Sequence, residues 1–196
     1  LADPDVKKYL IGLPIVLVIA AVVYVVLKNN LQIFETANGG FRANRVYEWL
    51  SGGSYQILQG LYAIGSGRIF GCGLGKGLQK LGFVPEAQND MIFSIICEEG
   101  GLFGACLVIA VFAVLIWRLM VISIHARDLG GALIAGGIMG HIALQVILNI
   151  AVVTNTIPNT GITLPFISYG GTSVLFLMTE MGLALSVSRR IKLQTE

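Results

Sequence analysis

Asp90 is the residue of this sequence whose type and position most clearly suit catalysis. It ends a basic, glycine-rich stretch, residues 71–90, and an apolar run follows it directly. Partial removal from water favours the neutral form of a carboxyl group and raises its pKa. A higher pKa makes the carboxylate a better general base. Lys76 and Lys80 lie in the same stretch; their charges oppose that effect, and they are able to hold a phosphate group. Asp90 equally suits the N-cap of a following helix, so spacing alone leaves both roles open.

The glycines of this stretch do not form a nucleotide-binding motif. A P-loop needs a glycine, four residues, and then Gly-Lys-Ser/Thr. Counted back from Lys76, the first glycine falls on Phe70, and Gly77 stands where the hydroxyl residue belongs. The dinucleotide pattern G-x-G-x-x-G fails in every frame of the stretch. We therefore interpret it as a flexible basic loop.

A second pair of charges lies earlier in the chain. Arg42 and Arg45 are three residues apart, so they share a face if this segment is helical. Such a pair can clamp an anionic lipid head group, and it can equally be an ordinary anchor at the membrane interface.

Four further ionisable residues fall within apolar segments. Glu98 and Glu99 lie in the first third of one segment, where an ionisable group marks a functional site by default. We favour an ion pair between one of them and a basic residue on another helix. His141 and Glu180 each stand alone in a predicted helix. A proton path is one interpretation of this pair, and a polar contact from each to a helix outside this chain is the one we favour.

The tract 160–171 combines hydroxyl residues, glycines and one proline, and it includes Ser168 and Tyr169. It is predicted to interrupt the helices on either side. Irregular backbone at membrane depth is buried in protein or lines a cavity. The tract therefore either lines a substrate cavity or forms a re-entrant turn that only packs.

The composition of the chain indicates a membrane protein. Apolar residues make up 55%, charged residues 12%, and the mean hydropathy is +0.80. A soluble domain has roughly 25% charged residues, so this chain has too few to cover a surface in water. The net charge of +2 gives no reason to expect a nucleic-acid partner. The cysteines are odd in number, so neither a disulfide framework nor a zinc site is expected, and no metal-ligand set is predicted.

Hydropathy and helix breakers predict four membrane-spanning helices in a single membrane domain, residues 1–196. An outer loop holds a short amphipathic helix at residues 55–65, which lies on the membrane surface or dips into it. A further outer, re-entrant segment joins the last two spans. The predicted spans are residues 10–28, 91–118, 129–153 and 172–188, with the outer loop at 29–90 and the re-entrant segment at 154–171.

Basic residues set the orientation of such a chain, because they favour the cytoplasmic side. With four spans, seven of them fall on one side, which we expect to be cytoplasmic. They are Lys7, Lys8, Arg118, Arg127, Arg189, Arg190 and Lys192. The loop 29–90 and the segment 154–171 then face outward.

Four stretches of the sequence together resemble the SEDS family, which comprises the FtsW, RodA and SpoVE proteins of cell division, elongation and sporulation. Their order and spacing extend over nearly the whole chain, and the last is long and specific. The stretches are residues 55–67, residues 85–90 leading to Glu98 and Glu99, residues 149–154, and residues 158–171.

The resemblance implies an all-α polytopic membrane protein, with the four spans here the last four of an expected ten. It implies a multi-pass protein of the bacterial plasma membrane that polymerises lipid II, a lipid pyrophosphate-linked disaccharide peptide, into glycan strands by an inverting reaction. The expected partners are a class B penicillin-binding protein, which cross-links the peptides, and other division or elongation proteins. The resemblance implies no certain cofactor and leaves a divalent cation open.

The family's essential aspartate falls on Asp90, which favours the catalytic role over the capping role. Substrate-binding candidates are Arg42, Arg45, Lys76, Lys80, Glu86, Ser168 and Tyr169. A lipid II flippase and a non-catalytic scaffold for a penicillin-binding protein are the alternative functions.

The sequence departs from the family pattern at three positions. Arg68 stands where a glycine is common, Asn89 where a threonine is common, and Glu180 where an apolar residue is usual. Arg68 and Glu180 raise the alternative of an inactive paralogue. The chain begins with Leu1 rather than Met, and we expect it to be a piece of a longer protein that is inactive by itself.

Overall fold

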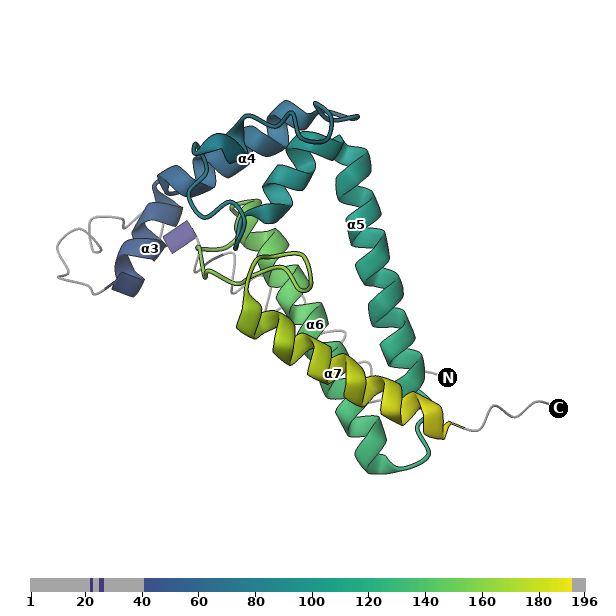
Figure 1. Ribbon diagram of the computed structural model, residues 1–196. Coiled ribbons are helices and arrows are strands. Elements are labelled where there is room, and N and C mark those ends of the chain that lie inside the picture. Colours follow the sequence, from purple (N-terminus) through teal and green to yellow (C-terminus); the bar gives the residue numbers. More distant parts are fainter. Residues whose placement is uncertain (1–21, 23–24, 27–40, 192–196) are drawn as a thin grey trace, which may run out of the picture. The chain divides into compact units, whose positions relative to one another are not determined.

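The structure is a computed structural model that describes residues 22, 25–26 and 41–191 (Figure 1). Every long regular element in these residues is a helix, and none of them forms a β-strand. The chain divides into two compact units, Leu1–Ser54 and Tyr55–Glu196.

The first unit contains helix α3, Phe41–Leu50. This helix was not predicted from sequence; it includes both Arg42 and Arg45. The predicted span at residues 10–28 belongs to the same unit and, apart from three positions, lies outside the described residues.

The second unit begins with helix α4, Tyr55–Gly67. It confirms the short helix predicted at residues 55–65 and is longer by two residues at its C-terminal end. Its buried face packs against α5 and is made of small or apolar residues, namely Ile57, Gly60, Ala63 and Gly67. A Cβ atom at Gly67 would lie 1.9 Å from the carbonyl oxygen of Cys97, so only glycine allows this close approach.

Helix α5, Ile92–Ile124, bends sharply at Gly101 (Figure 1). Gly101 has φ 63° and ψ −161°, a conformation that residues with a Cβ atom rarely adopt. Residues 102–124 alone form a rod of roughly 34 Å, enough to cross a hydrocarbon core of about 30 Å. Glu98 and Glu99 lie in the first third of α5, as predicted, in the part of the helix that precedes the bend.

Residues 68–73, here called the bend clasp, hold α5 on both sides of this bend through the backbone alone. Two carbonyl groups of α5 before the bend and two N–H groups after it form hydrogen bonds with the clasp, which is how backbone groups at a helix break are satisfied. The bonds are Cys72 N–H to Glu98 O (3.0 Å), Gly73 N–H to Glu99 O (3.1 Å), Leu102 N–H to Arg68 O (2.9 Å) and Phe103 N–H to Ile69 O (3.2 Å).

Helix α6, Leu129–Val153, has the bounds of the third predicted span. Asp128 caps its N-terminus, because its carboxylate accepts the Gly131 N–H at 2.9 Å. Helix α7, Gly171–Arg190, extends the predicted span at residues 172–188 by one residue at its start and two at its end.

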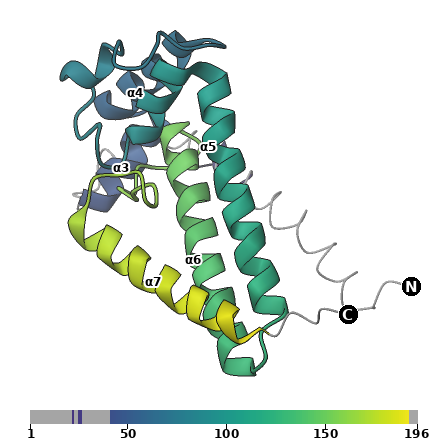
Figure 2. The same cartoon turned by 45° about the vertical axis from the view of Figure 1, so that its right-hand side comes forward.

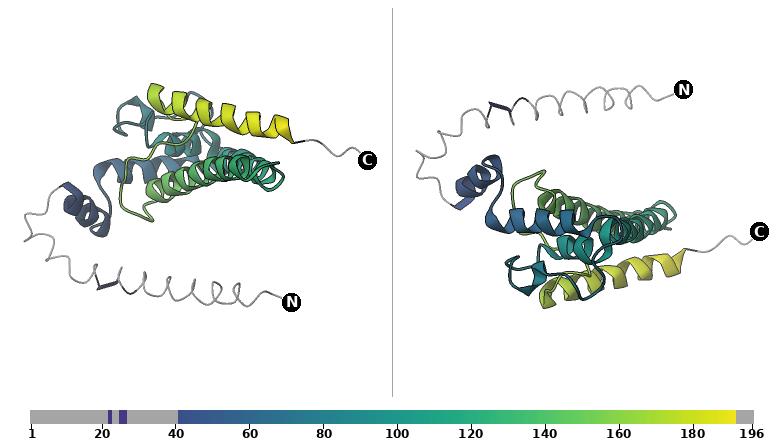
Figure 3. Two further views of the ribbon diagram at one scale, coloured as in Figure 1. Left: turned by 90° about the horizontal axis from the view of Figure 1, so that it is seen from below. Right: turned by 90° about the horizontal axis from the view of Figure 1, so that it is seen from above.

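Helices α5, α6 and α7 are each long and apolar enough to cross a membrane. The crossing part of α5 and helix α6 lie side by side, and α7 packs beside them (Figures 2 and 3). Buried residues of α4, α5, α6 and α7 form one continuous apolar core. The chain is thus an all-α polytopic membrane protein, with three candidate spans in the part that the structure describes.

His141 on α6 and Glu180 on α7 contact each other. The Nδ1 atom of His141 lies 3.0 Å from a carboxylate oxygen of Glu180. This corrects the prediction that each residue contacts a helix outside this chain. The pair forms a polar link between two apolar helices, where each group would otherwise face lipid.

Native cysteines provide a direct test of the predicted orientation. Cys72 is exposed in the bend clasp, Cys97 is buried, and Cys106 is exposed on the crossing rod of α5. If the loop faces outward, a membrane-impermeant maleimide is expected to label Cys72 in intact protoplasts. The measurement is the mass shift of the protein, with Cys72→Ser as the control; labelling that requires lysis would reverse the orientation.

Candidate active site

Asp90 lies next to the first turn of α5 without capping it. The N-cap of this helix is Met91, whose side chain forms no capping hydrogen bond. The capping role that spacing left open for Asp90 is therefore wrong. Its carboxylate oxygen Oδ1 instead accepts a hydrogen bond from Gln56 Nε2, at 3.1 Å.

Gln56, in the first turn of α4, joins three segments of the chain. Its Nε2 atom also donates to the carbonyl oxygen of Pro85, at 3.1 Å. Its Oε1 atom accepts from Nδ2 of Asn159, at 3.2 Å. One amide side chain thus connects α4, the end of the glycine-rich loop and the outer segment 154–170.

Asn149 holds the same region from the membrane side. It is fully buried in α6, one helical turn before the end of that helix. Its Nδ2 atom donates to the backbone carbonyl of Asp90 at 2.8 Å and to that of Ile162 at 2.7 Å. Asp90 is therefore fixed by its main chain to α6 and by its side chain to α4.

The outer segment 154–170 is irregular, as predicted, and it packs against the loop that carries Asp90. The N–H of Tyr169 donates to the carbonyl of Gln88 at 2.8 Å, while the Tyr169 side chain is exposed. Ser168 is buried, and its hydroxyl accepts the N–H of Leu164 at 2.7 Å. Substrate contacts by Ser168 and Tyr169 stay predictions.

A groove of about 570 Å³ lies between this loop and the first turns of α5. Lys80, Glu86 and Gln88 form its polar wall, and apolar residues including Ile92 and Ile95 form the rest. The groove brings together two predicted substrate-binding residues, Lys80 and Glu86. Asp90 follows the polar wall in sequence but does not line the groove.

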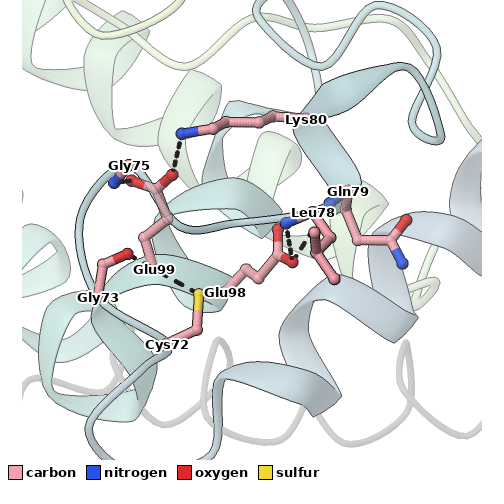
Figure 4. Close-up of polar contacts among 8 residues, drawn as sticks. All are labelled: Cys72, Gly73, Gly75, Leu78, Gln79, Lys80, Glu98 and Glu99. Carbon is pink, nitrogen blue, oxygen red and sulfur yellow. Dashed lines mark hydrogen bonds and ion pairs between the residues drawn. The ribbon is translucent and has the colours of Figure 1, made fainter.

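Glu98 and Glu99, just before the bend of α5, hold the glycine-rich loop in place (Figure 4). Glu99 accepts from Lys80 Nζ at 2.5 Å and from the Gly75 N–H at 3.0 Å. Glu98 accepts the N–H of Leu78 at 2.9 Å. The predicted ion pair is confirmed for Glu99, and its partner Lys80 lies in the short 3-10 helix η1, Gln79–Leu81, within the glycine-rich loop.

Three predicted substrate-binding residues remain, namely Lys76, Arg42 and Arg45. Lys76 is exposed on the glycine-rich loop. Arg42 and Arg45 belong to the first unit, and their action on a substrate stays a prediction.

Three residues of the centre were missed by reasoning from sequence, namely Gln56, Asn149 and Asn159. All three are amides, so they carry no charge that would mark them. Asn149 offered a signal, because an amide in an apolar helix needs a hydrogen-bond partner. Gln56 and Asn159 lie in stretches that carried the family resemblance, but their partners are far away in sequence.

Comparison with known proteins gives a consistent result. The family model for the cell cycle proteins FtsW, RodA and SpoVE matches residues 6–193. Stage V sporulation protein E of Bacillus subtilis is 46% identical over 155 residues, which cover 76% of this chain and 42% of that protein. The probable peptidoglycan glycosyltransferase FtsW of the same organism is 34% identical over 192 residues, covering 95% of this chain and 46% of that protein.

Two solved structures resemble the structure of this chain. A chain from a peptidoglycan synthase complex, in a study of how polymerization and crosslinking are coordinated, aligns with a TM-score of 0.63 at 23% identity, covering 95% of this chain and 50% of that one. A variant of the rod shape determining protein RodA of Thermus thermophilus aligns with a TM-score of 0.53 at 30% identity, covering 68% of this chain and 40% of that one. The chain spans less than half the length of the curated relatives described above.

Proposed function

The chain belongs to the FtsW/RodA/SpoVE family of cell cycle proteins, and from this premise we propose that it forms part of a peptidoglycan glycosyltransferase. The proposed enzyme polymerises lipid II into glycan strands at the outer face of the bacterial plasma membrane. The single observation that carries the proposal is the setting of Asp90. The N-cap of α5 is Met91 rather than Asp90, and two amide side chains fix Asp90 from two directions.

In the proposed reaction, the 4-hydroxyl of one sugar attacks the anomeric carbon of a lipid-linked sugar. Asp90 takes the hydroxyl proton as the new C–O bond forms, and the lipid pyrophosphate leaves with the electrons of the broken bond. A single displacement inverts the configuration at the anomeric carbon. The leaving group needs no strong acid, but its growing negative charge must be held.

Cationic side chains are the proposed holders of that charge. Lys76 is exposed on the glycine-rich loop, and Lys80 borders the groove. Because Lys80 pairs with Glu99 in this structure, it must exchange that partner to hold a pyrophosphate. Arg42 and Arg45 extend the set of proposed cations.

A divalent cation has no evident site in the described part of the chain. Among residues 22, 25–26 and 41–191, no three His, Cys, Asp or Glu side chains lie close enough to hold a metal ion. We therefore propose no reaction step through a metal.

A class B penicillin-binding protein is the proposed partner, together with other division or elongation proteins. Support comes from the fold shared with a chain of a peptidoglycan synthase complex. Such a partner would cross-link the peptides of the strands that the glycosyltransferase makes.

Purified lipid II provides the test of this function. The protein is expressed from its own gene with any flanking coding sequence, purified in detergent, and incubated with lipid II. Glycan strands resolved by gel electrophoresis are the expected product. Translocation of labelled lipid II across liposomes without strand formation would support the flippase alternative, and neither activity, with retained binding of a transpeptidase, would support the scaffold.

A further inference from the structure

We infer that Gln56 is a positioning residue that sets the orientation of the Asp90 carboxylate in the proposed reaction. The inference rests on the proposed function, in which Asp90 is the general base. Gln56 does not line the groove and is not one of the charged residues proposed above to act on the substrate. The observation behind it is the hydrogen-bonded series Asn159, Gln56, Asp90, at 3.2 Å and 3.1 Å.

The surroundings of Gln56 determine which way its amide points. Two acceptors, the Pro85 carbonyl and the Asp90 carboxylate, both face the same end of the side chain. Turning the amide round would place its oxygen against two other oxygens, with no hydrogen between them. The nitrogen must therefore face Asp90, and the Asn159 N–H group at the other end supports this orientation.

A neutral donor suits this position better than a cation would. A lysine or arginine beside Asp90 would stabilise its negative charge and weaken it as a base. An amide N–H restrains the carboxylate with a smaller effect on its charge. Since Gln56 is half-buried and bound at both ends, it limits rotation of the carboxylate without neutralising it.

Gln56→Glu is the direct test, because it keeps the size of the side chain and replaces the amide donor with a carboxyl group. Two carboxyl groups would then face each other, and the pair would retain a proton to higher pH. We expect the acidic limb of the polymerisation rate against pH to move upward by about one pH unit or more. On the acidic limb, a shift of one unit lowers the rate at a fixed pH about tenfold, and we expect recovery at higher pH with little change in the KM for lipid II.

Gln59→Glu is the matched control. Gln59 lies on the same helix, one turn further along, and is also half-buried. The substitution adds the same charge at a position that does not face Asp90 through a hydrogen bond. Its pH profile is expected to follow the wild type.

Asn159→Asp tests the series from its far end. The new carboxylate cannot donate to the Gln56 oxygen, so the amide would lose the bond that supports its orientation, and a negative charge would be added two residues along the series from Asp90. We expect a shift of the acidic limb in the same direction as for Gln56→Glu, but smaller. This variant also carries the test if Gln56→Glu fails to accumulate as folded protein.

The outcomes separate the inference from the proposed function. Wild-type protein that makes no glycan, or Asp90→Asn with full activity, would refute the proposed function itself. If both of those controls behave as expected, an unmoved limb in Gln56→Glu overturns only the role of Gln56. An equal shift in Gln59→Glu would overturn it as well, since added charge alone would then explain the effect.

Discussion

Asp90→Asn is expected to abolish glycan polymerisation while the protein still folds and binds its partner. The asparagine keeps the size of the side chain and an oxygen that can accept from Gln56 Nε2. The bond from Asn149 goes to the backbone carbonyl and is unaffected. Only the ability to take a proton is lost, and a positioned general base contributes typically about 10²–10⁴-fold to the rate.

The assay for this variant is strand formation from purified lipid II, with wild type measured alongside. Asp128→Asn is the control, because it makes the same chemical change at the N-terminus of α6, where asparagine caps as well as aspartate. The control should polymerise lipid II at close to the wild-type rate. Wild-type yield from Asp90→Asn would remove Asp90 as the base and favour the flippase or scaffold.

Gly101→Ala is expected to destabilise the protein by about 3 kcal/mol or more, through backbone strain and steric overlap. An added Cβ atom would lie 2.4 Å from the Gly71 nitrogen and 2.5 Å from the Ile69 carbonyl oxygen, and φ at this position is 63°. Either the bend straightens or the bend clasp moves away. Both changes break backbone hydrogen bonds that hold the glycine-rich loop.

Gly100→Ala is a stringent control for that effect. Gly100 is the preceding residue of the same helix, and an added Cβ atom would meet nothing within 4 Å. Alanine there should be neutral or mildly stabilising, by up to about 1 kcal/mol. The measurement is thermal unfolding in detergent together with abundance in the membrane. Equal behaviour of the two alanine variants would contradict the steric account of the bend.

The parts of the fold that depend on local composition were predictable. The bounds of α6 and the existence of α4 and α7 follow from runs of apolar residues and their breakers, which act within a few residues. The bend at Gly101 was not predictable in this way. Its glycine resembles the others of an apolar segment, and the four bonds that stabilise the bend come from residues 68–73.

The candidate site shows the same limit. Asp90 stood out by its charge and by the family resemblance, whereas the amides around it did not. Gln56 is 34 residues from Asp90 in sequence, and Asn149 is 59 residues away. Hydrogen bonds over such separations leave no periodic pattern. For the same reason, His141 and Glu180, 39 residues apart, were each predicted to need a partner but not to be each other's.

The bend clasp has a consequence for how this sequence can change over generations. All four of its bonds are made by main-chain groups. The bend therefore depends on the backbone path of residues 68–73 and not on side-chain hydrogen bonds. Arg68 illustrates this latitude: its side chain points to solvent, and it occupies the left-handed conformation, with φ 49°, that glycine would adopt at lower cost. Lineages can therefore drift at Arg68, Ile69, Phe70 and Cys72 while the helix keeps its bend. Gly101 does not tolerate such substitutions. A substitution there would need a compensating change in the backbone of the clasp in order to persist.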